Sequence, residues 1–391
     1  MKKMSMGSRR EVVERLRARY ERAGWPYRRK LIDQLCELCG YERKYGIKVL
    51  GGKRPGPRGM PQGGARMHYG DGERQVIRQI WQWGDYPCGK RLAAMLPLWL
   101  PGYERRYGAL RTELRQKVLA ISAATLDRLL AKDRAKVQTH RGTTKPGRLL
   151  RSQIPVRCES WDTKRPGCLE ADTVDHGGDS TAGSYMHSIT YTDIYSGWVE
   201  QAAVWNKGAA GVVSRTRQIE AELPFVLLGF DSDNGSEFIN HHLWRYFSAR
   251  KEPVEFTRSR EYRKNDNAHV EEKNWTKVRQ LLGYQRYDRP ELVELVHELY
   301  RNEWRLLQNF FMPVMKLQEK RRQGAKVHKK HDVPMAPAQR LLACKDLPDN
   351  KREWLLRMQA TLDPVTLNEA VGRRLTKIQA VLRNGQKSKA A

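Results

Sequence analysis

The stretch that most constrains the fold is residues 225–238, where an apolar run leads directly into an acidic, glycine-containing turn. Residues 225–230 have the composition of a short buried strand, and a helix is expected over residues 237–249. A strand that delivers a carboxylate to a turn in front of a helix is a common way to build an active site. The turn offers two candidates, of which Asp233 is the preferred site residue and Asp231 the alternative.

The pattern around this stretch predicts an α/β domain whose first three strands form an antiparallel meander. Runs of β-branched and aromatic residues indicate strands, and apolar residues at helical spacing indicate helices. The other strands are expected at residues 169–174, 184–195, 198–204 and 254–256. The other helices are expected at residues 209–223 and 266–282. The resulting order is three strands, helix, strand, helix, strand, helix, which implies a mixed sheet with flanking helices.

Two further acidic positions can lie close to Asp233. One is Asp172, which is expected at the end of the first strand and has Asp175 as a nearby competitor. The other is Glu271, which lies in the last helix of the domain and has Glu272 as its competitor. Because that helix follows the last strand directly, one of its faces can approach the strand ends that carry the other carboxylates.

Helical spacing favours Glu271 over its neighbour. Asn267, Glu271 and Asn274 occupy positions i, i+4 and i+7 and therefore share one helix face. Asn234 and Asn267 are expected to position the carboxylates or a phosphate. Oxygen ligands of this kind suit Mg²⁺ or Mn²⁺ rather than zinc. Two such ions about 4 Å apart would hold the attacking and leaving oxygens of an in-line phosphoryl displacement.

Together these residues resemble DDE-type transposases of the retroviral-integrase-like superfamily, and specifically bacterial insertion-sequence transposases with an integrase catalytic core. The matching segments are residues 170–174, 192–198, 231–238 and 264–271. The spacing between Asp233 and Glu271 is close to that usual in the superfamily. The resemblance is firm over residues 155–285 and looser over the N-terminal helical blocks and residues 313–342. It implies an RNase-H-like catalytic domain in which Asp172, Asp233 and Glu271 are the catalytic metal ligands.

The remainder of the chain divides by composition into helical, basic regions. Residues 51–70, for example, are rich in Gly, Pro and Arg, as in a flexible linker. The predicted order is a helix-turn-helix-like DNA-binding domain (1–50), a flexible basic linker (51–70), a second helical DNA-binding domain (71–132), a basic linker (133–160), the RNase-H-like integrase catalytic domain (161–285) and a mostly helical, basic C-terminal region (286–391). A plain three-helix bundle is the alternative for the first domain, because no short motif defines a helix-turn-helix securely.

Cys36 and Cys39 form a C-x-x-C pair in the first domain, without a second pair at zinc-finger spacing. They fall within a helical apolar pattern, so packing in a core is favoured over metal binding. In the same region Ser8 is expected to cap the first helix, and Gly40 to end the second. The six cysteines of the chain are scattered rather than arranged as a disulfide framework, which favours a reducing cytosol.

Basic residues strongly outnumber acidic ones, which predicts an anionic partner. The chain has 73 Lys and Arg against 44 Asp and Glu, and residues 1–150 hold 34 of the former and 13 of the latter. Nucleic acid is the first candidate, and a generally basic, solvated surface is the alternative. No apolar stretch approaches the ~20 residues of a membrane span, and no signal-peptide core follows Met1. A cytoplasmic, nucleoid-associated bacterial protein without a membrane partner is therefore expected.

Candidate DNA contacts come from three places. The last helix of the second helical domain, for which Ser122 is the expected cap, suits a major groove, although plain packing is equally open. The basic linker that follows can lie along DNA, and lysines near the predicted site can contact phosphates unless they form a solvated helix face. The candidates are Thr125, Arg128, Lys145, Lys264, Lys273 and Lys277.

The sequence thus predicts a DNA transposase. Water would first attack the phosphodiester at the element end and free a 3′-OH, which would then attack target DNA. The expected partners are double-stranded DNA, as terminal inverted repeats and as target, and at least one more copy of the chain, since two ends are cut and joined. The alternatives are an RNase-H-like nuclease without strand transfer and a catalytically inactive, transposase-derived DNA-binding regulator. The N-terminal helices count against the first, and the presence of all three acids counts against the second.

Overall fold

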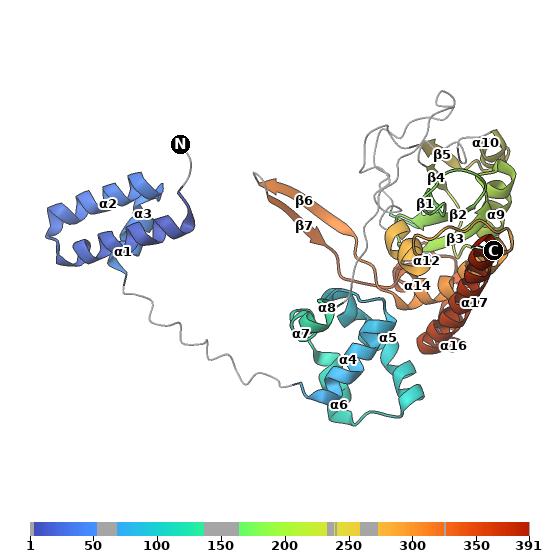
Figure 1. Cartoon of the computed structure of the whole chain (residues 1–391), viewed down its shortest axis with the longest axis horizontal. Helices are drawn as coiled ribbons and strands as arrows, with labels where there is room; N and C mark the ends of the chain where they lie inside the picture. Colours follow the sequence, from blue (N-terminus) through green and yellow to red (C-terminus); the bar gives the residue numbers. More distant parts are fainter. Residues whose placement is uncertain are drawn as a thin grey trace. The chain divides into compact units, whose positions relative to one another are not determined.

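The structure is a computed structural model that describes residues 4–52, 69–136, 164–232, 238, 241–258, 273–323 and 326–390 (Figure 1). The chain forms two compact units, Met1–His68 and Tyr69–Ala391. Among the described residues, no helix is long and apolar enough to cross a membrane.

The first unit consists of three helices, as expected: α1 (Met6–Arg22), α2 (Trp25–Cys39) and α3 (Arg43–Gly51). Ser5 rather than Ser8 caps α1, since the Ser5 hydroxyl accepts a hydrogen bond from the Ser8 backbone N–H at 3.1 Å. Gly40 ends α2 with φ 64°, in the left-handed region that favours glycine. The assignment of this unit as a helix-turn-helix stays a prediction.

The C-x-x-C pair belongs to the core of this unit. Cys39 is 1% exposed and packs with Leu31, Leu35 and Leu50, while the half-buried Cys36 packs against the same cluster. Both are free thiols. The prediction that these cysteines fill a core is therefore confirmed.

The second unit begins with a helical block. Its helices are α4 (Asp71–Trp83), α5 (Gly89–Tyr107), α6 (Thr112–Ala120), α7 (Ala123–Leu129) and α8 (Ala131–Arg134). Ser122 caps α7 as expected, because its hydroxyl accepts from the Thr125 N–H at 3.2 Å. The buried Trp99 of α5 donates its indole N–H to the Phe311 carbonyl at 2.8 Å. The block thus shares one hydrophobic core with the C-terminal half of the chain.

A mixed five-stranded sheet follows, and it fits the expected RNase-H-like core. Its strands are β1 (Cys168–Asp175), β2 (Met186–Asp193), β3 (Val199–Trp205), β4 (Gly229–Ser232) and β5 (Glu255–Arg258). They lie in the order β3-β2-β1-β4-β5. The first three strands are antiparallel, whereas β4 and β5 pair parallel to β1 and β4 respectively. The expected antiparallel meander is confirmed.

Two strand boundaries differ from the prediction. Asp172 lies inside β1, not at its end, because β1 keeps its pairing with β2 as far as Asp175. Residues 225–230, expected as a buried strand, contribute only the last two residues to β4, which begins at Gly229. The side chain of Val226 is 63% exposed, as expected of a connection rather than a central strand.

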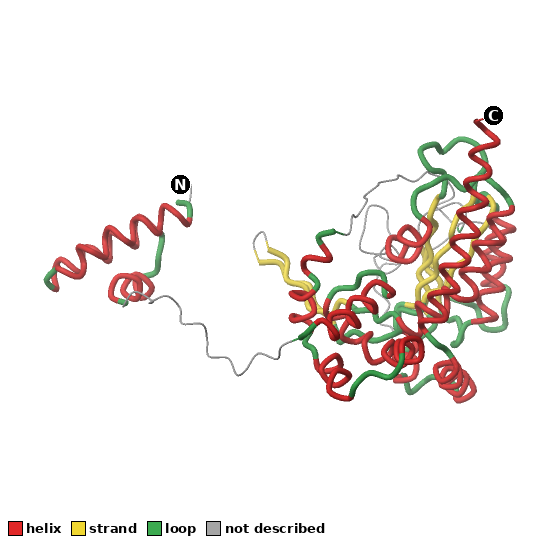
Figure 2. Tube along the Cα trace, turned by 60° about the horizontal axis from the view of Figure 1, so that its bottom comes forward, coloured by secondary structure: helices red, strands yellow, loops and turns green. Residues whose placement is uncertain are grey.

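Helices cover both faces of the sheet (Figure 2). On one face lie α9 (Ala209–Glu222) and α10 (His241–Ser248). There Phe230 of β4 packs against the rings of Phe247 and Phe256 at 4.8 and 5.6 Å. On the other face lies η1 (Asn274–Arg279), a π-helix that continues into α12 (Gln280–Leu282). This second face carries most of the buried polar residues discussed below.

A long helix begins after Pro290 and runs through α13 (Glu291–Leu299), the π-helix η2 (Tyr300–Trp304) and α14 (Arg305–Phe311), within the C-terminal region expected to be mostly helical. It covers the edge of the sheet. The Asn309 amide accepts from the Val199 N–H and donates to the Val199 carbonyl, both at 2.8 Å. One side chain thereby satisfies the backbone of edge strand β3.

The rest of the C-terminal region is mostly helical, but it also contains a β-hairpin. The hairpin strands are β6 (Leu317–Gln323) and β7 (Lys326–His331), and the helices are α15 (Pro337–Ala343), α16 (Asp349–Thr361) and α17 (Pro364–Ala390). The sequence did not predict this hairpin, because its charges hide the alternation that usually marks a strand.

Candidate active site

Asp172 lies in a polar strip on the second face of the sheet. It pairs in register with Thr190 of β2, while the preceding Glu170 pairs with Thr192 and with Asp231 of β4. Residues directly opposite one another point to the same side of a sheet, so these five side chains share one face. Asp172 is half-buried and the other four are buried. The strip is therefore open to solvent at the Asp172 end.

The predicted helix face reaches this strip through Asn274. Its amide Nδ2 donates to Asp172 Oδ2 at 2.6 Å, and Asp172 Oδ1 accepts from the Thr173 backbone N–H at 2.7 Å. Asn274 Oδ1 is one of several buried side-chain oxygens that have no hydrogen-bond donor among the described residues. An amide oxygen in that position, next to a carboxylate, is a suitable ligand for a hard cation.

A π-helix aims Asn274 at Asp172. π-turns widen a helix and occur frequently at functional sites. In η1 the Lys277 carbonyl accepts hydrogen bonds from Trp304 Nε1 at 3.1 Å and from Gln201 Nε2 at 3.4 Å. These donors come from η2 and β3, so the wide turn is held by the elements that surround it.

The two described lysines of the predicted DNA cluster lie on the same segment. Lys273 is only 6% exposed. Lys277 is half-buried, with its ammonium 3.0 Å from Met312 Sδ and 5.5 Å from the centre of the Trp304 ring. In the helical block, the exposed Arg128 donates to the hydroxyl of the half-buried Thr125 at 3.1 Å, which holds these two candidates together on α7.

Six predicted site residues lie outside the described residues: Asp233, Asn234, Lys145, Lys264, Asn267 and Glu271. Within the part of the chain that the structure describes, no three His, Cys, Asp or Glu side chains form a group that could hold a metal ion. The described portion of the site therefore consists of Asp172, Asn274 and the polar strip around them.

Three residues compete with the predicted metal ligands. Glu272 lies outside the described residues, and Asp231 and Asp175 have other partners. Asp231 is fully buried and accepts from the Thr257 hydroxyl at 2.5 Å. Asp175 accepts from His187 Nδ1 at 2.8 Å and pairs with Lys207 at 3.2 Å. Burial favours the neutral form of Asp175, but the His187 hydrogen bond and the Lys207 charge outweigh it and lower the pKa of Asp175 to about 2.

The lowered pKa of Asp175 makes its contribution to stability depend on pH. We expect Asp175→Asn to lower the free energy of unfolding by about 1 kcal/mol at pH 7, a discounted value because the side chain is 37% exposed and water screens the pair. Since the folded pKa lies below the unfolded one, this stabilisation is present above about pH 5 and is lost as the pH falls towards 2.

Urea unfolding of wild type and Asp175→Asn at pH 7 and pH 3 measures this effect, with the exposed Asp179→Asn as the matched control. An equal loss of stability at both pH values would show that the Asp175 charge is not responsible.

A buried hydrogen-bonded chain next to this strip was not found from the sequence. His176 Nε2 lies 2.8 Å from Ser188 Oγ, which in turn lies 2.8 Å from the Tyr300 hydroxyl. Burial, with a smaller contribution from Arg279, lowers the pKa of His176 to about 3. The chain ties His176, the residue after β1, and Ser188 of β2 to Tyr300 of η2. Nothing in the sequence links Ser188 with a tyrosine so distant along the chain.

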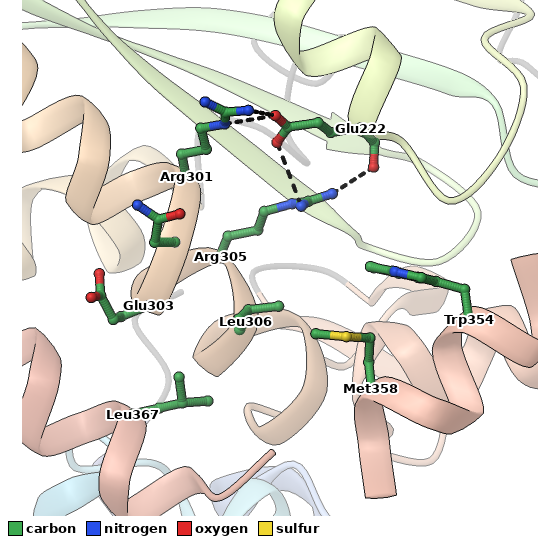
Figure 3. A pocket seen from close by; sticks show the side chains of 9 residues that line it. Glu222, Arg301, Glu303, Arg305, Leu306, Trp354, Met358 and Leu367 are labelled. Carbon is green, nitrogen blue, oxygen red and sulfur yellow. Dashed lines mark hydrogen bonds and ion pairs between the residues drawn. The ribbon is translucent and has the colours of Figure 1, made fainter. Parts of the chain in front are cut away.

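A cavity of about 470 Å³ lies elsewhere in the second unit (Figure 3). Arg301 and Arg305 line one side, where both pair with Glu222. Trp354 and Met358 of α16 form an apolar side. The cavity shares no lining residue with the polar strip around Asp172, so it is not part of the candidate active site.

Comparison with known proteins found similarities in structure and in sequence. No protein-family model matches the chain. Two solved structures are similar over part of it: the catalytic core domain of BIV integrase (18% identity, TM-score 0.23, 30% of this chain and 70% of that chain) and the simian T-cell lymphotropic virus intasome in complex with PP2A regulatory subunit B56 gamma (14% identity, TM-score 0.26, 46% of this chain). The chain matches 59% of the length of the intasome chain.

One similarity in sequence is much more extensive than these similarities in structure. The uncharacterized protein y4rM of Sinorhizobium fredii (strain NBRC 101917 / NGR234) is 37% identical over 343 residues, which cover 87% of this chain and 96% of y4rM. Because this identity extends over most of both proteins, the chain belongs to the y4rM family.

Proposed function

We propose that this protein is a DNA transposase that cuts the ends of its element and joins the freed 3′-OH groups to target DNA. The single observation that carries the proposal is the 2.6 Å hydrogen bond between Asn274 and Asp172. These residues come from the first strand and the last helix of the predicted catalytic set. Their contact supports the convergence that a DDE-type site requires.

The register of the sheet supports the second carboxylate. Ser232, the last residue of β4, pairs with Ala171, directly before Asp172. Asp233 follows Ser232 in the sequence, and consecutive Cα atoms are ~3.8 Å apart. We propose that Asp233 and Asp172 lie side by side at this point of the sheet.

The third carboxylate is proposed from helical spacing. Glu271 precedes Asn274 by three positions, and residues at i and i+3 share a helix face. If the helix extends N-terminally from Lys273, the face that carries Asn274 towards Asp172 carries Glu271 as well. Glu272 would then be turned away from the strip.

We propose that the donors around Asp172 help to hold two Mg²⁺ or Mn²⁺ ions. The carboxylate and Asn274 Oδ1, which has no hydrogen-bond donor in the described part of the chain, are both hard oxygen ligands. Bound divalent ions would neutralise charge that develops on the phosphate oxygens. The protein itself would orient Asp172 through Asn274, and positive charge on Lys277 would favour approach of the DNA backbone. Because two element ends are joined, at least two copies of the chain are expected on DNA.

A strand-transfer assay tests this function. Wild-type protein is incubated with Mg²⁺, a plasmid target and paired oligonucleotides taken from the DNA that flanks the coding sequence. We expect joined products, and we expect Asp233→Asn to abolish them. Equal joining by Asp233→Asn would refute the three-carboxylate mechanism. Cutting without joining would instead identify a nuclease, and binding without either reaction would identify a regulator.

A further inference from the structure

The β6–β7 hairpin is a strongly basic surface element to which the proposed mechanism assigns no role. Residues 316–331 contain seven Lys or Arg and a single acid, Glu319. Both figures show the hairpin extending away from the rest of the second unit (Figures 1 and 2). Its two strands form a sheet of their own, separate from the five-stranded sheet. The side chains of Lys329 and Lys330 are exposed, and that of Arg321 is 76% exposed.

The hairpin contains more cations than its own acid can pair with. Arg321 forms an ion pair with Glu319, and the register places Lys330 opposite the same glutamate. Lys329 and Lys330 are both exposed, and an isolated two-stranded hairpin is marginally stable in water. One carboxylate cannot balance the seven cations of residues 316–331, so an anionic partner would stabilise the hairpin.

The root of the hairpin, in contrast, is held firmly. Val314 and Met335 exchange two backbone hydrogen bonds, at 2.9 and 3.2 Å. Asp332 accepts from the Lys316 N–H at 2.7 Å and from Arg340 at 2.6 Å. The Lys316 ammonium donates to the Tyr195 carbonyl at 2.7 Å, in the turn between β2 and β3. These contacts fix the base of the hairpin, so its charged end can hold a bound ligand in a defined position relative to the sheet.

The distribution of charge over the hairpin identifies the kind of polyanion. Successive residues of a strand point to opposite faces, so Lys329 lies on one face and Lys330 on the other, together with Arg321. A flat anionic surface would attract cations on one face only. The major groove of duplex DNA has phosphates along both walls and is wide enough for a two-stranded ribbon. Cations on both faces match a groove with two charged walls.

We propose that the β6–β7 hairpin is a DNA-binding ribbon that enters the major groove of duplex DNA and contacts phosphates on both walls. The choice of DNA among polyanions rests on the proposed function. The ribbon takes no part in the proposed chemical step, so its contribution is measured as affinity for duplex DNA.

The test is the salt dependence of duplex binding by the full chain, measured by fluorescence anisotropy with a labelled 30-bp duplex. Each phosphate contact contributes roughly 0.9 to the slope of log affinity against log salt. Lys329→Gln and Lys330→Gln should each lower the slope by about 0.9, and the double variant by about 1.8. Between 50 and 200 mM NaCl the double variant should lose roughly 12-fold less affinity than wild type.

The matched control is Arg373→Gln/Lys377→Gln, which removes two exposed cations from α17 and should leave the slope unchanged. Lys329→Arg/Lys330→Arg keeps the charges and should keep the wild-type slope. Thermal unfolding reports on folding, and the glutamine variants should melt close to wild type because both lysines are exposed on the surface.

A wild-type slope in the double glutamine variant would overturn the proposal. The proposal would also be overturned if only one of the two single variants changed the slope and that variant also lost binding to phosphatidylserine vesicles. That result would indicate that the hairpin binds a flat membrane surface. Asp172→Asn should bind with the wild-type slope, so failure of the ribbon and failure of the catalytic proposal give different results.

Discussion

Asp172→Asn is expected to reduce strand transfer by roughly 10³-fold or more, with little change in affinity for DNA. The substitution keeps the size of the side chain but removes the negative charge that would hold a divalent cation. Both oxygens of Asp172 accept hydrogen bonds, one of them from the Asn274 amide. An asparagine side chain has only one carbonyl oxygen and cannot accept both. The effect should therefore fall on the chemical step rather than on binding.

The neighbouring Asp175 provides a matched control on the same strand. Asp175→Asn removes an acid three positions away, but that acid is already paired with His187 and Lys207. It should keep strand transfer within a few-fold of wild type and lose only stability. The measurement is the initial rate of joined product at saturating DNA, together with anisotropy for affinity. If Asp175→Asn is the inactive variant and Asp172→Asn the active one, the assignment of the first ligand is reversed.

Arg305→Met is expected to lower the free energy of unfolding by about 3–5 kcal/mol. Arg305 is 8% exposed and Glu200 is 3% exposed, and Arg305 Nε lies 2.7 Å from Glu200 Oε1. The same carboxylate accepts from Trp198 Nε1 at 2.7 Å. Burial raises the pKa of Glu200, and the Arg305 charge opposes that rise. Without Arg305, a buried carboxylate would be left without its cation, which is far more costly than losing the pair as a whole.

Two further variants separate this cause from simple loss of packing. Arg301→Met breaks a pair with Glu222 in which the arginine is 48% exposed, and it should cost no more than about 1 kcal/mol. The double variant Glu200→Gln/Arg305→Met should recover much of the lost stability, because no unpaired charge remains. Urea unfolding at pH 7 measures all three. If Arg301→Met and Arg305→Met lower the free energy of unfolding by similar amounts, burial of the Arg305–Glu200 pair is not the cause of the loss.

Local sequence patterns were sufficient for most of the elements. Alternation and β-branched residues located β1, β2 and β3, and apolar spacing located α9. Caps were predicted where one side chain decides the geometry, as at Ser122 and Gly40. The first cap was misplaced because Ser5 and Ser8 have the same chemistry, and only the backbone at Ser5 is extended.

The residues of the candidate site could be predicted from the sequence, but the contact between them could not. The sequence supplied Asp172 and Asn274 separately, and helical spacing placed Asn274 on the face that carries Glu271. It could not show that Asn274 meets Asp172, nor that Asp172 lies inside β1. That contact depends on how the last helix crosses the sheet, which a π-turn and its bonds to Trp304 and Gln201 decide.

The sequence by itself determined the order of strands and helices, the candidate acids and the basic character of the chain, because each follows from local spacing and composition. Tertiary structure alone decided three other features. It joined Trp99 to Phe311, built the buried chain from His176 to Tyr300, and raised a basic hairpin on the Asp332 and Lys316 contacts. Each of these depends on side chains far apart in the sequence, and their partners are selected by packing in three dimensions.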